Sequence, residues 1–118
     1  MVLDTQFDII GLNNKEYDLD RDRLAAKLGF KRSDIDMLIN IFKKNANVSL
    51  EEMNRMIKQN NIQGIADAAH AIKGSAGNLK MDKIFELSKN IEIMAKTMKN
   101  EEYKVHYIQL KNMIAELD

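Results

Sequence analysis

The sequence predicts an all-α protein: an antiparallel four-helix bundle with a short additional N-terminal helix that covers one end. Three observations favour this fold. The chain of 118 residues contains no proline and only five glycines, so few residues interrupt helices. Apolar residues, 45% of the total, recur in long stretches at the period of a helix with one buried face. Short polar turns separate these stretches, which makes consecutive helices antiparallel neighbours.

The start of the chain carries the weakest periodic pattern. Residues 1–18 contain a short apolar cluster at residues 7–12, and we expect them to form an irregular lead-in that packs on one end of the domain. A short helix is expected over about residues 20–28. Asp20 is its predicted N-cap, and Gly29 follows its last turn.

The first helix of the bundle is expected to begin near residue 34 and to end at residues 60–61. Ser49 and Glu52 form a capping-box pattern, which would suit a helix that restarts there. The apolar positions nevertheless hold one phase throughout, so we expect one continuous helix that is bent near residues 45–49. The residues expected to face the core are Ile35, Leu38, Ile39, Phe42, Ala46, Leu50, Met53, Met56 and Ile57.

Three further helices complete the expected bundle, which spans about residues 34–117. The first covers about residues 62–80, the second has Asp82 as its N-cap, and the third covers about residues 102–117. The residues expected on their buried faces are Ile62, Ile65, Ala69, Ile72, Ala76 and Leu79, then Ile84, Leu87, Ile91, Met94, Ala95 and Met98, then Tyr103, Tyr107, Leu110, Ile114 and Leu117. Residues 1–118 are therefore expected to form a single domain with one core.

His70 is the residue that most strongly suggests chemistry. At about 100° per residue it lies roughly 120° from the centre of the apolar face of its helix, so its ring is expected to face water at the edge of the core. Its neighbours on the same side of the helix are Ala66, Lys73 and Gly74, about one turn away, and Gly77, about two turns away. Small residues would leave the ring accessible. An interior glycine costs about 0.8–1 kcal/mol relative to alanine, so some benefit is expected to offset that cost.

The segment HAIKGSAGNL, residues 70–79, resembles the signature of histidine-containing phosphotransfer (HPt) domains of two-component phosphorelays. The shared features are the histidine, lysine three residues later, glycine four residues later, and small residues before a Gly-Asn-Leu ending. The helical pattern on both sides also suits the antiparallel bundle of that family. One position departs from the family pattern, because Lys80 stands where many members have glycine, and the shape of the following turn depends on it.

The resemblance implies that His70 accepts a phosphoryl group from an aspartyl phosphate of a response-regulator receiver domain, or from a kinase histidine by way of one. The group would then pass to an aspartate of another receiver. An imidazole suits this role because its unperturbed pKa of about 6.5 leaves a neutral nucleophilic nitrogen. Lys73 would attract the phosphoryl group, although its position also suits a lysine that extends into water. Gly74, Gly77 and Ala66 would give the partner access to the ring.

Glu92 is expected beside His70 for a geometric reason. Both lie eleven residues from Met81, the centre of the turn that joins their antiparallel helices, so they should lie at the same height. The Glu92 carboxylate would then accept a hydrogen bond from Nδ1–H of the ring and leave Nε2 to attack. Family members are similar, with Gln or Glu in this place. The alternative is a solvated glutamate near Lys89 and Lys96.

Other classes of function fit less well. The 18 basic and 18 acidic residues balance, so nucleic acid is not an expected partner. The absence of cysteine excludes disulfides and thiolate chemistry. The sequence has no Glu-x-x-His pair for a metal site in a bundle and no GxxxxGK[ST] loop for ATP. Neither a metal site nor an enzyme with its own ATP site is therefore expected, and His106 is assigned to the surface or to packing.

The expected protein is a soluble cytoplasmic phosphocarrier and a monomer, with no apolar stretch of about 18 residues and no signal-peptide pattern. Its partners would be receiver domains or a hybrid sensor histidine kinase. No cofactor is expected in the chain itself, and the resemblance implies that the receiver supplies Mg²⁺. The alternative is a non-catalytic helical adaptor for signalling partners, in which the eight methionines line a groove. An acid-labile phosphoryl adduct at His70 would distinguish the two.

Overall fold

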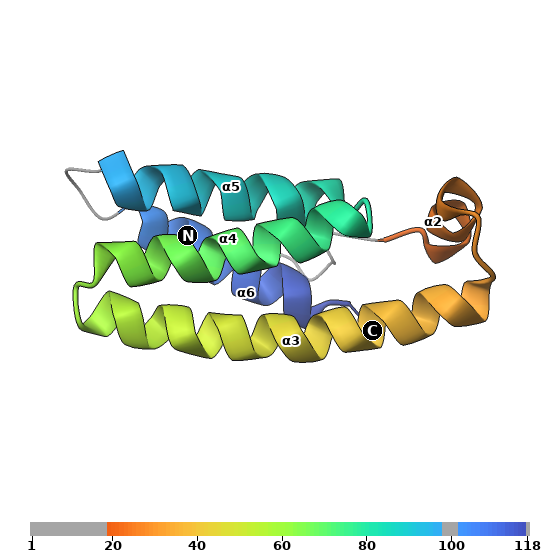
Figure 1. The fold of residues 1–118 in the computed structure, drawn as a ribbon, viewed down its shortest axis with the longest axis horizontal. Helices are drawn as coiled ribbons and strands as arrows, with labels where there is room; N and C mark the ends of the chain where they lie inside the picture. The colour runs from red at the N-terminus through yellow and green to blue at the C-terminus, as the bar shows by residue number, and fades with distance from the viewer. Residues whose placement is uncertain (1–18, 98–101, 118) are drawn as a thin grey trace, which may run out of the picture.

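The computed structural model describes residues 19–97 and 102–117, which form five α-helices and no strand (Figure 1). The helices are α2 (Arg21–Leu28), α3 (Arg32–Lys58), α4 (Ile62–Asn78), α5 (Asp82–Thr97) and α6 (Tyr103–Ala115). The all-α class, the helical bundle and the additional N-terminal helix are thereby confirmed. The lead-in expected at residues 1–18 lies outside the described residues.

The four long helices form a closed ring. Figure 1 shows α3, α4 and α5 side by side along the long axis, with α6 behind them. Each packs against the next in the chain, and α6 completes the ring through its contact with α3. α4, the helix of His70, thus has α3 on one side and α5 on the other. A functional group at the α4–α5 boundary receives side chains from both helices.

The core consists mainly of aliphatic side chains from all four long helices. The largest fully buried side chains are Ile35, Ile39, Met53, Ile65, Ile72, Met81, Ile84, Ser88, Ile91, Leu110 and Ile114. Burial of each isoleucine or leucine contributes about 1.5–3 kcal/mol relative to exposure. Ser88 is the polar member, and its hydroxyl donates to the Ile84 carbonyl at 2.8 Å, so its burial leaves no polar atom unpaired.

Helix α3 is continuous over 27 residues, and the capping-box pattern does not interrupt it. Glu52 instead forms an ion pair with Arg55, three residues later on the same helix. The predicted continuity of this helix is thus confirmed, whereas two details predicted elsewhere are wrong. Ile62 is 40% exposed, because it is the first residue of α4 and lies at the end of the bundle. Asp82 lies inside the first turn of α5 and is not the residue before it.

Helices α2, α3 and α4 end with the same turn. Just past each helix one residue has a left-handed backbone: Gly29 at φ 75°, Asn60 at φ 54° and Lys80 at φ 58°. The N–H of the following residue bonds to a carbonyl five residues earlier at 2.9 Å, in the pairs Phe30–Ala25, Asn61–Met56 and Met81–Ala76. This is the Schellman motif, for which glycine is preferred and asparagine is tolerated. Lysine at Lys80 is the costly case, since a Cβ disfavours this conformation.

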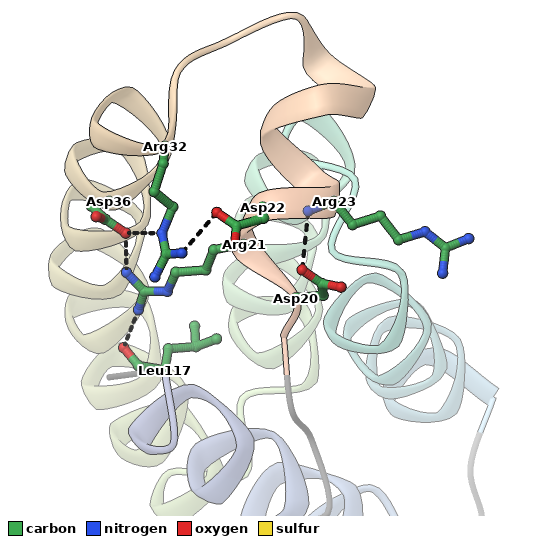
Figure 2. A network of polar contacts seen from close by, with 7 residues as sticks. All are labelled: Asp20, Arg21, Asp22, Arg23, Arg32, Asp36 and Leu117. Atoms are coloured by element: carbon green, nitrogen blue, oxygen red, sulfur yellow. Dashed lines mark hydrogen bonds and ion pairs between the residues drawn. The ribbon is translucent and has the colours of Figure 1, made fainter.

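Two arginines and two aspartates hold α2 against one end of the bundle (Figure 2). Arg21 donates to Asp36 at 2.8 Å and to the Leu117 carbonyl at 3.4 Å. Arg32 donates to Asp36 at 3.1 Å and to Asp22 at 2.9 Å. The hydrogen bonds from Arg21, and then from Arg32, lower the pKa of Asp36. The short helix is therefore tied both to the start of α3 and to Leu117, just past the end of α6.

The structure also bears on membrane and metal binding. In the part of the chain that the structure describes, no helix is both long and apolar enough to cross a membrane. Over the same residues, no group of three or more His, Cys, Asp and Glu side chains is placed to hold a metal ion.

His106 is half-buried on α6, and its Nδ1 is buried without a hydrogen-bond partner among the described residues.

Candidate functional site

His70 lies in the middle of α4 with its ring turned outward. Asn61 caps the start of this helix, because its side chain accepts a hydrogen bond from the Gly64 N–H at 2.9 Å. Ala69 and Ile72, on either side of His70 in the sequence, are buried against the core. Because these residues fix the rotation of α4, His70 is left at the surface, with 65% of its side chain exposed. The ring is therefore accessible from solvent.

Glu92 reaches His70 from α5. Its Oε2 lies 3.1 Å from Nδ1 of the ring, which is the distance of a hydrogen bond. The turn at Lys80 and the buried Met81 place the two antiparallel helices so that these residues stand opposite each other. When Glu92 accepts from Nδ1–H, the neutral ring has its lone pair on Nε2, on the side away from the carboxylate.

Lys73 is directed to the same carboxylate. Its Nζ lies 2.7 Å from Oε1 of Glu92, so the two oxygens of this glutamate are shared between His70 and Lys73. The hydrogen bond from Lys73 holds the pKa of Glu92 below its ordinary value, although burial acts in the opposite direction. Only 16% of the Glu92 side chain and 24% of the Lys73 side chain are exposed. Glu92 is thus an ionised carboxylate at the floor of the site.

The sequence analysis did not identify the Lys73–Glu92 ion pair, and it named Lys96 near Glu92 only for the alternative of a solvated glutamate. Nζ of Lys96 lies 4.0 Å from Oε2 of Glu92 and makes a second, looser ion pair. Two spacings in the sequence could have indicated both. Lys73 follows His70 by three residues and so shares its side of α4, and Lys96 follows Glu92 by four, the spacing of a helical ion pair.

The residues expected to give a partner access differ in their positions. Gly74 is exposed, and a Cβ added there would meet no atom within 4 Å. Gly77 is half-buried, and a Cβ there would lie 3.2 Å from the ring of Phe85 on α5, so this glycine makes room for helix packing. Ala66 is only 1% exposed and belongs to the core. Its placement on an accessible surface is wrong, because the buried face of α4 is wide enough to include Ala66 and Ala68.

Together these residues define a recognisable class of protein. The imidazole of His70 is exposed, and a carboxylate holds one of its two nitrogens. The other nitrogen is a nucleophile that a partner can reach in the folded protein. The nearby ammonium of Lys73 supplies positive charge of the kind that attracts phosphate. A helical bundle with such a histidine on its surface has the features of a phosphotransfer module.

Comparison with known protein families gives the particular family. The family model of the Hpt domain matches residues 37–118, well over half of the chain. The chain belongs to the Hpt domain family, and it is a histidine-containing phosphotransfer module. Hpt domains are phosphocarriers and interact with response regulators and kinases. Searches of curated proteins and of solved structures find no match to this chain.

Proposed function

We propose that His70 accepts a phosphoryl group from the aspartyl phosphate of one receiver domain and passes it to the aspartate of another. The observation that carries this proposal is the 3.1 Å contact between Nδ1 of His70 and Glu92, made by a histidine side chain that is 65% exposed. In this arrangement Nε2 is the attacking atom. Its lone pair forms the N–P bond while the O–P bond of the acyl phosphate breaks and the receiver keeps its carboxylate.

The remaining residues act on charge and access. The proton stays on Nδ1, where the Glu92 carboxylate offsets the positive charge that the ring gains. Lys73 lies close enough to turn toward the phosphoryl oxygens, since it is one helical turn from His70. Gly74, which is open to solvent, leaves room for the receiver to approach in line with Nε2. The Mg²⁺ ion of the reaction would be supplied by the receiver partner.

The chain would work in the cytoplasm as a carrier without an ATP site of its own. It would connect a hybrid sensor kinase or one receiver to a second receiver. This division of labour suits the site, because phosphoryl transfer needs mainly positioning and charge compensation, and the partner provides the activated phosphate.

The test is His70→Gln, compared with the parent for phosphorylation by phosphoramidate and by phosphorylated receiver domains. We expect the variant to keep the helical circular dichroism of the parent, because the ring is exposed and packs little. It should take up no acid-labile phosphoryl group. A variant that is still phosphorylated would show that His70 is not the acceptor, and a parent that accepts from no donor would favour the adaptor function.

A further inference from the structure

Three nitrogen atoms surround the Glu92 carboxylate, at unequal distances. Lys73 Nζ lies 2.7 Å from Oε1, while Nδ1 of His70 and Nζ of Lys96 lie 3.1 Å and 4.0 Å from Oε2. Lys96 is 52% exposed, against 24% for Lys73. Lys73 is therefore the close cationic partner of Glu92, and Lys96 is a second cation that lies at the limit of ion-pair distance.

The charges at this site change when His70 is phosphorylated. With a neutral ring, two ammonium groups face one carboxylate, and the net charge is +1. A phosphoryl group adds about −1.5 to −2 charges near pH 7. Lys73 is then attracted both to Glu92 and to the phosphoryl group, which competes for it from the same side of α4. If Lys73 turns to the phosphoryl oxygens, Glu92 loses its closest partner beside a new negative group.

We propose that Lys96 replaces Lys73 as the cationic partner of Glu92 when His70 carries a phosphoryl group. This inference rests on the function proposed above. Nζ of Lys96 needs to move only about 1 Å, from 4.0 Å to a charge-assisted hydrogen-bond distance of about 2.8 Å. A half-exposed lysine on a flexible stem can make this movement. Glutamate four residues before lysine is also the favourable order for a pair on one helix.

The exchange gives each negative group its own ammonium during transfer. Nε2 has donated its lone pair to phosphorus, the proton remains on Nδ1, and the ring carries a positive charge that Glu92 offsets. Lys73 neutralises the phosphoryl oxygens, and Lys96 keeps Glu92 ionised and hydrogen-bonded to the ring. Without Lys96, Lys73 would have to serve both groups. Lys96 is thus a positioning residue, which acts on the reacting atoms through Glu92.

The experiment measures the ratio of phosphorylated to unphosphorylated protein at steady state in phosphoramidate, by intact-mass spectrometry at neutral pH. We expect Lys96→Gln to lower this ratio about two- to five-fold, the effect of an exposed ion pair. Lys96→Arg should restore it. Lys89→Gln is the matched control, since Lys89 is an exposed lysine about one helical turn before Glu92 on α5, and the ion pairs of Glu92 within the described residues are with His70, Lys73 and Lys96. It should behave as the parent.

A double variant separates exchange from simple attraction at a distance. When Lys73→Gln is already present, Lys96 pairs with Glu92 in both states, so adding Lys96→Gln should no longer lower the ratio. If Lys96→Gln lowers the phosphorylated-to-unphosphorylated ratio as much in the Lys73→Gln background as in the parent, the exchange is overturned. It is also overturned if Lys96→Gln alone leaves the ratio unchanged, or if Lys89→Gln lowers it equally. These results leave the proposed function intact provided that the parent is phosphorylated on His70. A parent that takes no phosphoryl group overturns both.

Discussion

A single carboxylate determines how His70 is presented. Glu92 holds Nδ1 of the ring at 3.1 Å and Lys73 at 2.7 Å, and 16% of its side chain is exposed. The histidine therefore owes its orientation to a residue on another helix. Its direct neighbours on α4 are small or point to the core, and they allow the ring to rotate about its own side-chain bonds.

The orienting role predicts graded effects of two substitutions at Glu92. Glu92→Ala should slow transfer by about tenfold or more without abolishing it, by analogy with residues that orient metal-binding histidines. Glu92→Gln should retain more activity, because its amide oxygen still accepts from Nδ1–H. Rates of transfer from a phosphorylated receiver would measure the difference. Equal rates in the parent and Glu92→Ala would show that Glu92 is only a solvated side chain.

Gly74 should show opposite effects on stability and on transfer. A Cβ at this exposed helical position meets nothing, so Gly74→Ala should raise the free energy of unfolding by up to about 1 kcal/mol. Gly74→Arg should also fold, but it should slow transfer from a receiver while phosphorylation by phosphoramidate continues. Denaturant unfolding and the two transfer assays check this.

Gly77→Ala is the comparison for that result. Its Cβ would meet the Phe85 ring at 3.2 Å, so the ring must shift and the gain in stability should be smaller than at Gly74. If Gly74→Ala lowers stability, or if Gly74→Arg transfers at the parent rate, the glycine does not serve partner access.

At the scale of the helices, the turns matter as much as the apolar faces. The turn after α4 sets the register of α5, and hence the height of Glu92 relative to His70. Its left-handed residue is Lys80 at φ 58°, where glycine would fit without steric cost. The chain thus retains the turn that a glycine would favour, with a less suitable residue in the critical position.

Lys80→Gly should therefore stabilise the protein by up to about 1 kcal/mol, because relief of the left-handed backbone outweighs the extra freedom of glycine in the unfolded chain. Asn60→Gly, in the equivalent turn after α3, should gain less, since asparagine tolerates this conformation. Thermal and denaturant unfolding of the two variants test the comparison. If Lys80→Gly is less stable than the parent, the lysine makes a contact that stabilises the fold by more than its left-handed backbone costs.

The sequence predicted those parts of the fold and site that depend on long, regular patterns. Isoleucine and leucine at helical spacing located the four long helices, and counting from Met81 placed Glu92 opposite His70. The rotation of α4 was less predictable because alanine suits both core and surface. Ala66 was therefore assigned to the wrong side, and the packing role of Gly77 was missed. The spacing of Lys73 from His70 places both residues on one side of α4, but the pairing of Lys73 with Glu92 also depends on the rotamer of a long side chain.

At the scale of the whole molecule, the short helix α2 combines the buried side chains of Leu24 and Ala25 with charged contacts at the end of the bundle. Among the described helices it packs against α3 only, and Arg21 joins it to both Asp36 and the Leu117 carbonyl. The side chain of Arg21 is 15% exposed, so these hydrogen bonds are partly shielded from water. The two ends of the described chain are thereby connected through one guanidinium group.

Arg21→Met should loosen α2 and leave the bundle folded. Amide hydrogen exchange should become faster in α2 but not in α4, because only the network at the end is lost. Low pH should also loosen α2 and speed amide exchange in it. The pKa of Asp36 is lowered by Arg21 and Arg32, so the stabilisation is present above the unfolded-state value of about 3.9 and is lost as pH falls through the folded-state value below it. Exchange in α2 that is unchanged by Arg21→Met would show that apolar packing alone holds the helix.

The exposure of His70 has a consequence for how long a signal can be kept. On the proposed function, a phosphoryl group on His70, whose side chain is 65% exposed, stays in contact with water until a partner binds. Hydrolysis therefore competes with delivery from the moment the bond forms. Such a module stores information only for the lifetime of a phosphoramidate bond in solvent. A phosphoryl group that meets no acceptor receiver within that time is lost to water.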